Sequence, residues 1–388
     1  MRRLLRLAAA AGVPALMAAT STGVSAGDVV GHVYVNDNTA VANTIAAFDR
    51  HSDGSLTTSA GSPFAAGGVG LGSIVGSQGA LQLSGDRRYL LAVDAGSNEI
   101  SVLRIRPNGA LDPVEGSPIS SGGVEPVSIA THGDLVYVAN EGDKARGTGS
   151  NYTGFTLNPG GHLAPLSGST FALPNTANPG DILFNSTGTD LVGVEVGTTD
   201  PRTFRIDSFT VGSDGRLIPA PGSPFRAQAR GPLGSEFSPV SPSHLYVSNA
   251  HDGPGDGSVS AFAVGPGGAL SSIGASPFTD GQTAPCWVEI SHDGSYLFAV
   301  NTASASISSY RILAGGSLSY LSSTPFKSGM GTGPFDARLD PTGANLYVVD
   351  SALDAVTAFS VSGGSLSEMP LSPFALPGGA TPFGIVAD

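Results

Sequence analysis

A seven-fold repeat constrains this chain more than any other feature of its sequence. Each copy contains a Gly-x-Leu step, and a Ser-Pro-Phe motif or a close variant begins eight residues after the glycine. The serine or threonine of this motif recurs at spacings of 48 to 55 residues, at Ser62, Ser117, Ser169, Ser223, Ser276, Thr324 and Ser372. A period of this length, filled with short strands, is typical of a propeller or a repeat array.

Each repeat contains four predicted strands. In the sixth copy, β-branched and apolar runs over 287–290, 296–300, 306–312 and 318–322 are separated by turns rich in Gly, Asp and Ser. Such runs between turn residues are typical of antiparallel hairpins. Seven units of four strands predict an all-β fold, a seven-bladed β-propeller. The phenylalanine of each Ser-Pro-Phe motif is expected to end the outer strand and to pack between blades.

The two ends of the repeat region predict how the ring closes. Residues 32–36 match a second strand with no first strand before them, and residues 381–388 match a first strand with nothing after it. We therefore expect the C-terminal strand to become the innermost strand of blade one, against residues 33–38. This pairing removes the open edges of the ring. It also buries Ile385, which falls in the apolar column of the first strands.

The first 26 residues are set apart from the repeats. Arg2, Arg3 and Arg6 precede or interrupt an apolar run, and small residues follow at 24–26. This pattern predicts a secretory signal peptide over 1–26, followed by a single propeller domain over 27–388. We therefore expect an exported protein, in the periplasm or secreted to the extracellular medium. We expect no membrane span, because no later apolar run reaches the roughly 18 residues required.

Charge and cysteine content narrow the range of partners. The net charge is −13 and the chain has only two lysines, whereas a nucleic-acid binder needs a basic surface. The single cysteine, Cys286, cannot form an internal disulfide, and no paired Cys or His spacing suggests zinc. We therefore expect no nucleic acid, no metal and no cofactor. The expected partner is an extracellular ligand or protein, bound by a monomer.

A first column of polar residues ends the second strand of every repeat. Its members should lie on one face of the ring, where the loops between second and third strands begin: Asp37, Asp94, Asn140, Glu195, Asn249, Asn301 and Asp350. Short Asn and Asp side chains in such positions cap loops by bonding to nearby backbone. Glu195 is too long for that cap, so it is a candidate ligand-binding residue. His132 and His292 fall in turns on the opposite face and are interpreted as turn residues.

A second polar column lies in the first strands, nearest the axis. Blades four to seven place there Asp181, Glu236, Trp287, Glu289, Asp336 and Arg338. One interpretation is a water-filled channel in which Arg338 balances Glu289 or Asp336, because adjacent carboxylates are unfavourable unless paired or hydrated. The other is a carboxylate site for a metal or for general acid/base catalysis, the latter with Glu236, Glu289 and Arg338 as catalytic residues. Asp181, Trp287 and Asp336 then bind the ligand, together with Glu195.

The sixth repeat also resembles a known family. Residues 290–301 read Ile-Ser-His-Asp-Gly-Ser-Tyr-Leu-Phe-Ala-Val-Asn, followed by Ser-Ile-Ser-Ser-Tyr at 306–310 and Gly-Ser-Leu at 316–318. This pattern resembles the lactonase-type seven-bladed propellers, which include 6-phosphogluconolactonases and carboxymuconate-cyclising enzymes. The resemblance covers about residues 31–388. The Ser-Pro-Phe repeats look most like the exported bacterial members of that family.

The resemblance implies catalysis by a His, Arg and Glu cluster at the channel mouth. The matching stretch in this chain, Glu125-Pro-Val-Ser128, has no His, and an acidic channel does not suit a phosphorylated substrate. We therefore expect a binding or interaction module that presents its loop face to a polymer, a peptide or another protein.

The alternative is a lactonase-like enzyme, either a carboxylic-ester hydrolase or a cyclase, acting on a sugar lactone or a related small molecule. In that case Glu236 or Glu289 is the general base and Arg338 stabilises the oxyanion. Trp287 then forms an apolar wall of the site.

Overall fold

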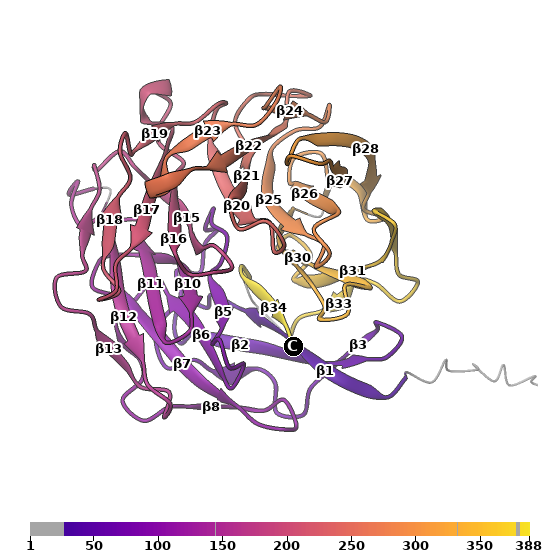
Figure 1. Cartoon of the computed structure of the whole chain (residues 1–388). Helices are drawn as coiled ribbons and strands as arrows, with labels where there is room; N and C mark the ends of the chain where they lie inside the picture. Colours follow the sequence, from indigo (N-terminus) through magenta and orange to yellow (C-terminus); the bar gives the residue numbers. More distant parts are fainter. Residues whose placement is uncertain (1–26, 144, 332, 378–380) are drawn as a thin grey trace, which may run out of the picture.

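The computed structural model describes residues 27–143, 145–331, 333–377 and 381–388. The predicted signal peptide over 1–26 lies outside the described residues. The described chain forms seven antiparallel sheets around a common axis, and Figure 1 views this ring along the axis. Its only described helices are three 3-10 turns, η1 (Pro201–Thr203), η2 (Pro266–Gly268) and η3 (Gly329–Gly331). The prediction of an all-β, seven-bladed propeller is confirmed.

Each blade has four main strands, which follow one another from the axis outward. Blade one contains β34 (Ile385–Ala387), β1 (Val29–Asn36), β2 (Thr44–His51) and β3 (Leu56–Thr58). Blade two contains β5 (Leu81–Leu83), β6 (Tyr89–Asp94), β7 (Glu99–Ile105) and β8 (Leu111–Pro113). Blade three contains β10 (Pro126–His132), β11 (Leu135–Asn140), β12 (Asn151–Leu157) and β13 (Leu163–Pro165).

The other four blades repeat this order. Blade four contains β15 (Pro179–Phe184), β16 (Asp190–Glu195), β17 (Arg205–Val211) and β18 (Leu217–Pro219). Blade five contains β20 (Pro232–Phe237), β21 (His244–Asn249), β22 (Ser258–Val264) and β23 (Leu270–Ser272). Blade six contains β25 (Pro285–Ile290), β26 (Tyr296–Asn301), β27 (Ser306–Ile312) and β28 (Leu318–Pro325). Blade seven contains β29 (Pro334–Leu339), β30 (Asn345–Asp350), β31 (Ala355–Ser362) and β32 (Ser365–Glu368).

The Ser-Pro-Phe motif lies after the outer strand in most blades, so the prediction that its Phe ends that strand is wrong. The Phe or Ile instead begins a two-residue strand that pairs with the third strand: β4 (Phe64–Ala65), β9 (Ile119–Ser120), β14 (Phe171–Ala172), β19 (Phe225–Arg226), β24 (Phe278–Thr279) and β33 (Phe374–Ala375). The motif serine accepts a backbone N–H of that third strand, as Ser62 Oγ does from Ala47 N at 2.8 Å. The hydroxyl satisfies a donor that the short outer strand leaves open, which explains its recurrence.

Buried tyrosines join neighbouring blades. Five of them donate their hydroxyl to a backbone carbonyl of the next blade: Tyr34 to Gly109, Tyr89 to Pro159, Tyr137 to Gly215, Tyr246 to Gly316 and Tyr347 to Gly54. Each ring fills apolar space while its hydroxyl keeps a partner, as a buried tyrosine requires. The last of these bonds links blade seven to blade one across the closure of the ring.

The ring closes as the sequence predicts. Strand β34 pairs antiparallel with β1, with Val33 opposite Ala387 and Val35 opposite Ile385. Ile385 is fully buried. The C-terminal strand is therefore the innermost strand of blade one, and neither β1 nor the gap beside blade seven is left open.

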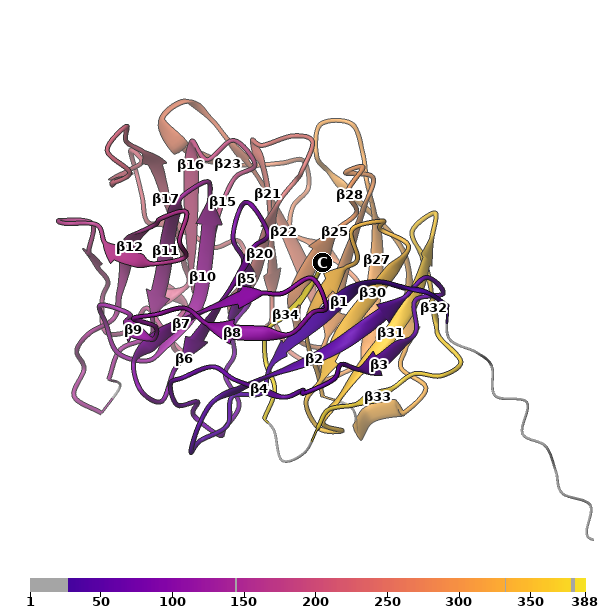
Figure 2. The ribbon, with the colours of Figure 1, turned by 90° about the horizontal axis from the view of Figure 1, so that it is seen from below.

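The ring has two distinct faces. We call the side that carries the turns between first and second strands the turn face. The loop face is the opposite side, with the loops between second and third strands and the linkers between blades. Figure 2 shows the ring from its side, with the blades running between these faces. None of the described helices has the length and apolar character that a membrane crossing requires.

Candidate functional site

The channel along the axis is closed at the loop face by the linker between blades one and two. This linker follows β4 and spans residues 66–80, which makes it the longest of the described linkers. We call its residues 71–79 the axial segment. Gln78 N donates to Gly180 O at 2.9 Å, and Ser77 Oγ donates to Val127 O at 2.8 Å. The axial segment is thereby fixed to blades three and four.

The carboxamide of Gln78 extends the same closure to blades five and six. Its Nε2 donates to Ser235 O and to Val288 O, each at 3.1 Å, and its Oε1 accepts from Val288 N at 3.1 Å. Trp287 Nε1 donates to Ser77 O at 2.7 Å, and the Trp287 ring lies 4.9 Å from that of Phe335. Trp287 is buried at the closed end of the channel rather than on the wall of an open cavity.

The channel carboxylates accept hydrogen bonds from inner strands of neighbouring blades. Asp181 accepts from Ser235 N at 2.9 Å and from the hydroxyls of Ser235 and Ser128. One layer nearer the turn face, Glu236 accepts from Ile290 N at 3.1 Å. An innermost strand has one edge without a sheet partner, so its N–H groups need acceptors from elsewhere. This requirement explains why acidic residues recur at these positions.

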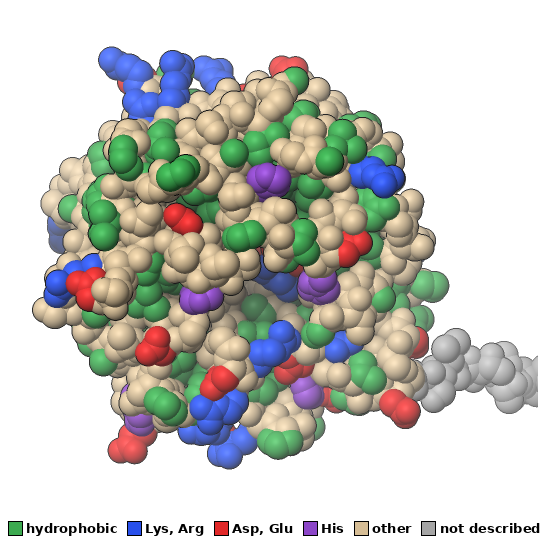
Figure 3. All heavy atoms as spheres, viewed as in Figure 1, with side chains coloured by type: hydrophobic (Ala, Val, Ile, Leu, Met, Phe, Trp, Pro, Cys, Tyr) green, Lys and Arg blue, Asp and Glu red, His purple; other side chains and the backbone are tan. Residues whose placement is uncertain are grey.

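The channel opens at the turn face through two adjoining cavities. The inner cavity holds about 150 Å³ and the mouth cavity about 220 Å³. Both are lined by Gln82, Glu236 and Arg338, and Asp181 lines only the inner cavity. Figure 3 views the turn face and shows a central hollow with basic side chains in it and histidines around it.

Arg338 and Glu289 form an ion pair at this open end. Arg338 Nη1 donates to Glu289 Oε2 at 3.1 Å, while Glu289 Oε1 accepts from Leu339 N at 2.8 Å. The pairing of Arg338 with Glu289, which the sequence suggested, is therefore present. Asp336 is fully buried, and its Oδ2 and the Nε of Arg338 have no hydrogen-bond partner among the described residues.

Burial shifts the titration of every carboxylate in the channel. Burial raises the pKa of Asp181 to about 7 and that of Asp336 to about 6. Burial, assisted by the charge of Glu289, raises the pKa of Glu236 well above its ordinary value. Burial also raises the pKa of Glu289, against the opposing effect of Arg338. One guanidinium thus faces four carboxyl groups that resist ionisation, and shifts of this kind gather at functional sites.

Sequence reasoning missed His292 and Arg87 as residues of the mouth cavity, although it placed His292 on the correct face. His292 lies on the turn face, as expected, but it lines the same cavity as Glu289 and Arg338. Its Nε2 is 2.8 Å from Asp340 O. The sequence contained a usable signal, because the first strands run toward the turns and place Glu289 only three residues before His292. Arg87, from the corresponding turn of blade two, also lines this cavity and donates to Ala387 O at 3.1 Å.

The polar column at the loop face makes cross-strand contacts. Asp94 accepts from Ser101 Oγ on the third strand and from Asn43 Nδ2 of blade one at 2.8 Å. Asn249 Nδ2 donates to Ser260 Oγ at 3.0 Å. For these residues the prediction of a local loop cap is wrong, because the side chains point across the sheet toward the third strand.

Glu195 lies in blade four, apart from the channel residues. Its side chain is buried and hydrogen-bonded to Asp207, which also accepts from Tyr152 Oη at 3.0 Å. Burial, with the charge of Asp207, raises the pKa of Glu195 to about 9, and burial raises that of Asp207 to about 6. The two carboxyl groups therefore share a proton at neutral pH. The structure does not bring Glu195 to the cavities that Glu236 and Arg338 line.

Comparisons with known proteins agree with this architecture. The family described as lactonase, seven-bladed β-propeller, matches residues 237–383. A Bacteroides uniformis protein provisionally named 6-phosphogluconolactonase is 19% identical at a TM-score of 0.73, with 93% of this chain and 100% of that chain covered. The periplasmic gluconolactonase of Pseudomonas aeruginosa is 17% identical at a TM-score of 0.66, with 92% and 98% covered. No curated protein matches the chain. At these identities the solved structures establish the fold alone.

Proposed function

We propose that this seven-bladed propeller, whose residues 237–383 match the lactonase propeller family, is an exported binding protein. It would hold a neutral, hydroxylated small molecule at the open end of its channel. The observation that carries the proposal is the blind channel. The axial segment closes the loop-face end, and Glu236, Arg338 and Gln82 line the two cavities at the other. Concave sites with a few convergent polar groups are where small ligands bind. The signal-peptide pattern over 1–26 supports export.

The charges of the site favour a neutral ligand. Arg338 is already paired with Glu289, and Asp181, Glu236 and Asp336 add further carboxyl groups around it. Among the described residues that line the inner cavity, Arg338 is the one basic side chain, and because it is already paired with Glu289 a phosphate or carboxylate on the ligand finds no unpaired cation there. Hydroxyl groups can instead donate to Glu236 and accept from Arg338. Cavities of about 150 and 220 Å³ suit a ligand of monosaccharide size, such as a sugar lactone.

Calorimetric titration of the purified protein tests this proposal. The panel pairs neutral sugar lactones and monosaccharides with their carboxylated and phosphorylated counterparts. We expect measurable binding of neutral members and at least about tenfold weaker binding of the anions. Gln82→Leu, which changes the cavity lining, should weaken binding, and Glu115→Gln on the exposed outer rim should leave it unchanged. Tighter binding of the phosphorylated members would contradict the proposal.

One observation favours lactone hydrolysis as a second candidate function. Glu236 accepts from Ile290 N through one oxygen and lines both cavities beside Arg338. In this scheme water attacks the lactone carbonyl carbon and its proton passes to the ionised Glu236. Arg338 donates to the carbonyl oxygen as negative charge develops on it. The ring C–O bond then breaks, and the ring oxygen takes the proton back from Glu236, which releases the open hydroxy acid.

Hydrolysis and binding are separable by one substitution. Glu236→Gln should abolish turnover of a bound lactone, followed by base uptake at constant pH, while calorimetry still detects binding. Because the pKa of Glu236 is raised, the rate should increase with pH as the carboxyl group ionises. A lactone that is bound but never hydrolysed by the native protein removes the second candidate and leaves the first.

A further inference from the structure

A wide groove on the turn face separates blades two and three. It holds about 930 Å³ and arises from a short turn, because only Gly133 and Asp134 connect β10 to β11. Residues 84–88 form the corresponding five-residue turn of blade two, and 185–189 that of blade four. The shorter turn of blade three leaves space that a longer one fills.

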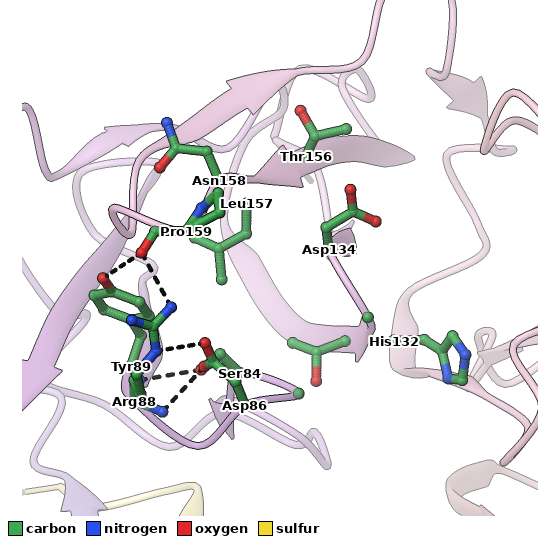
Figure 4. Close-up of a pocket in the computed structure, with 13 residues that line it drawn as sticks. Ser84, Asp86, Arg88, Tyr89, His132, Asp134, Thr156, Leu157, Asn158 and Pro159 are labelled. Atoms are coloured by element: carbon green, nitrogen blue, oxygen red, sulfur yellow. Dashed lines mark hydrogen bonds and ion pairs between the residues drawn. The ribbon is translucent and has the colours of Figure 1, made fainter.

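The two walls of the groove differ in how firmly their side chains are held. On one wall, Arg88 Nε pairs with Asp86 Oδ2 at 2.6 Å, and Arg88 Nη2 donates to Pro159 O at 3.1 Å (Figure 4). Asp134 and Thr156 line the other wall (Figure 4). The Asp134 carboxylate has no ion-pair partner within the described part of the chain. The groove therefore offers a fixed guanidinium–carboxylate pair opposite a carboxylate that is available to a ligand.

The groove continues toward the candidate site in the channel. Thr131, on the inner strand of blade three, lines both the groove and the inner cavity. The inner cavity in turn shares Gln82, Glu236 and Arg338 with the mouth cavity. The groove and the inner cavity therefore adjoin at Thr131, on the side of the channel between blades two and three.

We propose that this groove is a second subsite, which holds the further units of a neutral oligosaccharide whose terminal unit lies in the channel. This inference rests on the proposed function, since the channel must first accept a hydroxylated unit. The lining favours a sugar chain because it combines carboxylates, a guanidinium, hydroxyls and an amide, including Asp86, Arg88, Asp134, Thr156 and Asn158. These groups donate to and accept from hydroxyls in both directions. A peptide that binds by strand addition is less well matched, because the groove is lined by turns and by β12, which is already paired with β11 and β13.

The experiment measures affinity against ligand length. Neutral oligosaccharides of about one to four units are titrated into the full chain and into two variants. Asp134→Arg places a large side chain in the groove, and Asp214→Arg makes the same change on the exposed rim of blade four. We expect affinity of the native protein to rise about tenfold or more with length. Asp134→Arg should remove this rise and preserve monosaccharide affinity, whereas Asp214→Arg should behave like the native protein.

The outcomes separate this inference from the proposed function. Monosaccharide binding with no dependence on length overturns the groove subsite and leaves the proposed function standing. An absence of both monosaccharide and oligosaccharide binding overturns the proposed function and the inference together. A length dependence that survives Asp134→Arg places the further units elsewhere and also overturns the inference. Competition by neutral peptides but not by oligosaccharides overturns the assigned class of ligand.

Discussion

The two ends of the central channel are built from the same inner strands and have opposite character. At the loop face the amide of Gln78 has three hydrogen bonds, and the indole N–H of Trp287 has a partner. At the turn face Arg338 lies among carboxyl groups of raised pKa, and its Nε has no partner among the described residues. The closed end resembles a protein core in its satisfied polar groups. The open end retains unfavourable electrostatics, as functional sites do.

This difference indicates where stability and ligand binding reside. Polar groups at the closed end hold four blades to one segment, so their loss exposes buried backbone groups with no replacement. Carboxyl groups at the open end accept one strand-edge N–H each but repel one another when ionised. Replacing one of them with a neutral amide therefore removes unfavourable electrostatic repulsion. Substitutions at the two ends should therefore change the free energy of unfolding by different amounts and in opposite directions.

Removing residues 381–388 takes contacts from both ends of the channel and should have the largest effect on stability. It deletes β34, takes Val386 and Ala387 from the mouth cavity, and removes the bond from Thr381 N to Asp37 O at the loop face. It also removes the buried Phe383 and Ile385, which costs on the order of 5 kcal/mol or more. Since a domain has roughly 5–15 kcal/mol in total, the truncated protein should aggregate or melt far below the full chain. A monomeric product with an unchanged melting temperature in size-exclusion and thermal denaturation experiments contradicts the closure.

Gln78→Ala should destabilise the closed end by on the order of 3 kcal/mol. The substitution leaves Ser235 O and both the N–H and C=O of Val288 buried without this partner. Gln82→Ala at the open end is the matched control, because Gln82 lines the cavities and is only half-buried. Its effect should stay within about 0.5 kcal/mol, as for most exposed substitutions. Urea denaturation of both variants checks the comparison, and equal losses would refute it.

Glu195→Gln should stabilise the protein at alkaline pH, by on the order of 2 kcal/mol at pH 8. The folded-state pKa of about 9 exceeds the ordinary value of 4.5. The stabilisation that the protonated Glu195 contributes is therefore complete below pH 4.5 and is lost as pH rises toward 9. Glutamine keeps a donor toward Asp207 without titrating, so the variant should have a flatter stability curve over this range. Parallel curves for the two proteins would show that the buried pair does not govern this pH dependence.

Glu236→Gln should have a smaller effect of the same sign at pH 8. Its pKa is raised by burial and by Glu289, so its contribution to stability is also lost as pH rises. The side chain is half-buried and faces a cavity open to solvent, which limits the gain. Glutamine can still accept from Ile290 N. Thermal melting at pH 5 and pH 8 tests this prediction, with Glu115→Gln as control. A large decrease in the melting temperature of Glu236→Gln at pH 8 would contradict it and would make Glu236 a purely structural residue.

The repeat pattern is enough to predict the blades and the residues that face the axis. The repeat fixed the number of blades, because each Gly-x-Leu and Ser-Pro-Phe pair marks one outer strand and one return to the third strand. The incomplete ends predicted the pairing of β34 with β1. Since side chains alternate along a strand, Glu236, Glu289 and Arg338 were assigned correctly to the channel from their positions alone.

The open end of the channel and the other residues that line it could not be predicted in this way, because they depend on how the ring folds. The axial segment has no repeat and no strand periodicity, and Gln78 finds its partners 157 and 210 residues away, in blades five and six. The groove also forms between segments of different repeats, where the short turn of blade three lies beside the turn of blade two. A periodic pattern reports which side of a strand is buried, because that depends on local geometry. It cannot report which distant backbone groups an irregular linker satisfies, because those partners become neighbours only when the ring has closed.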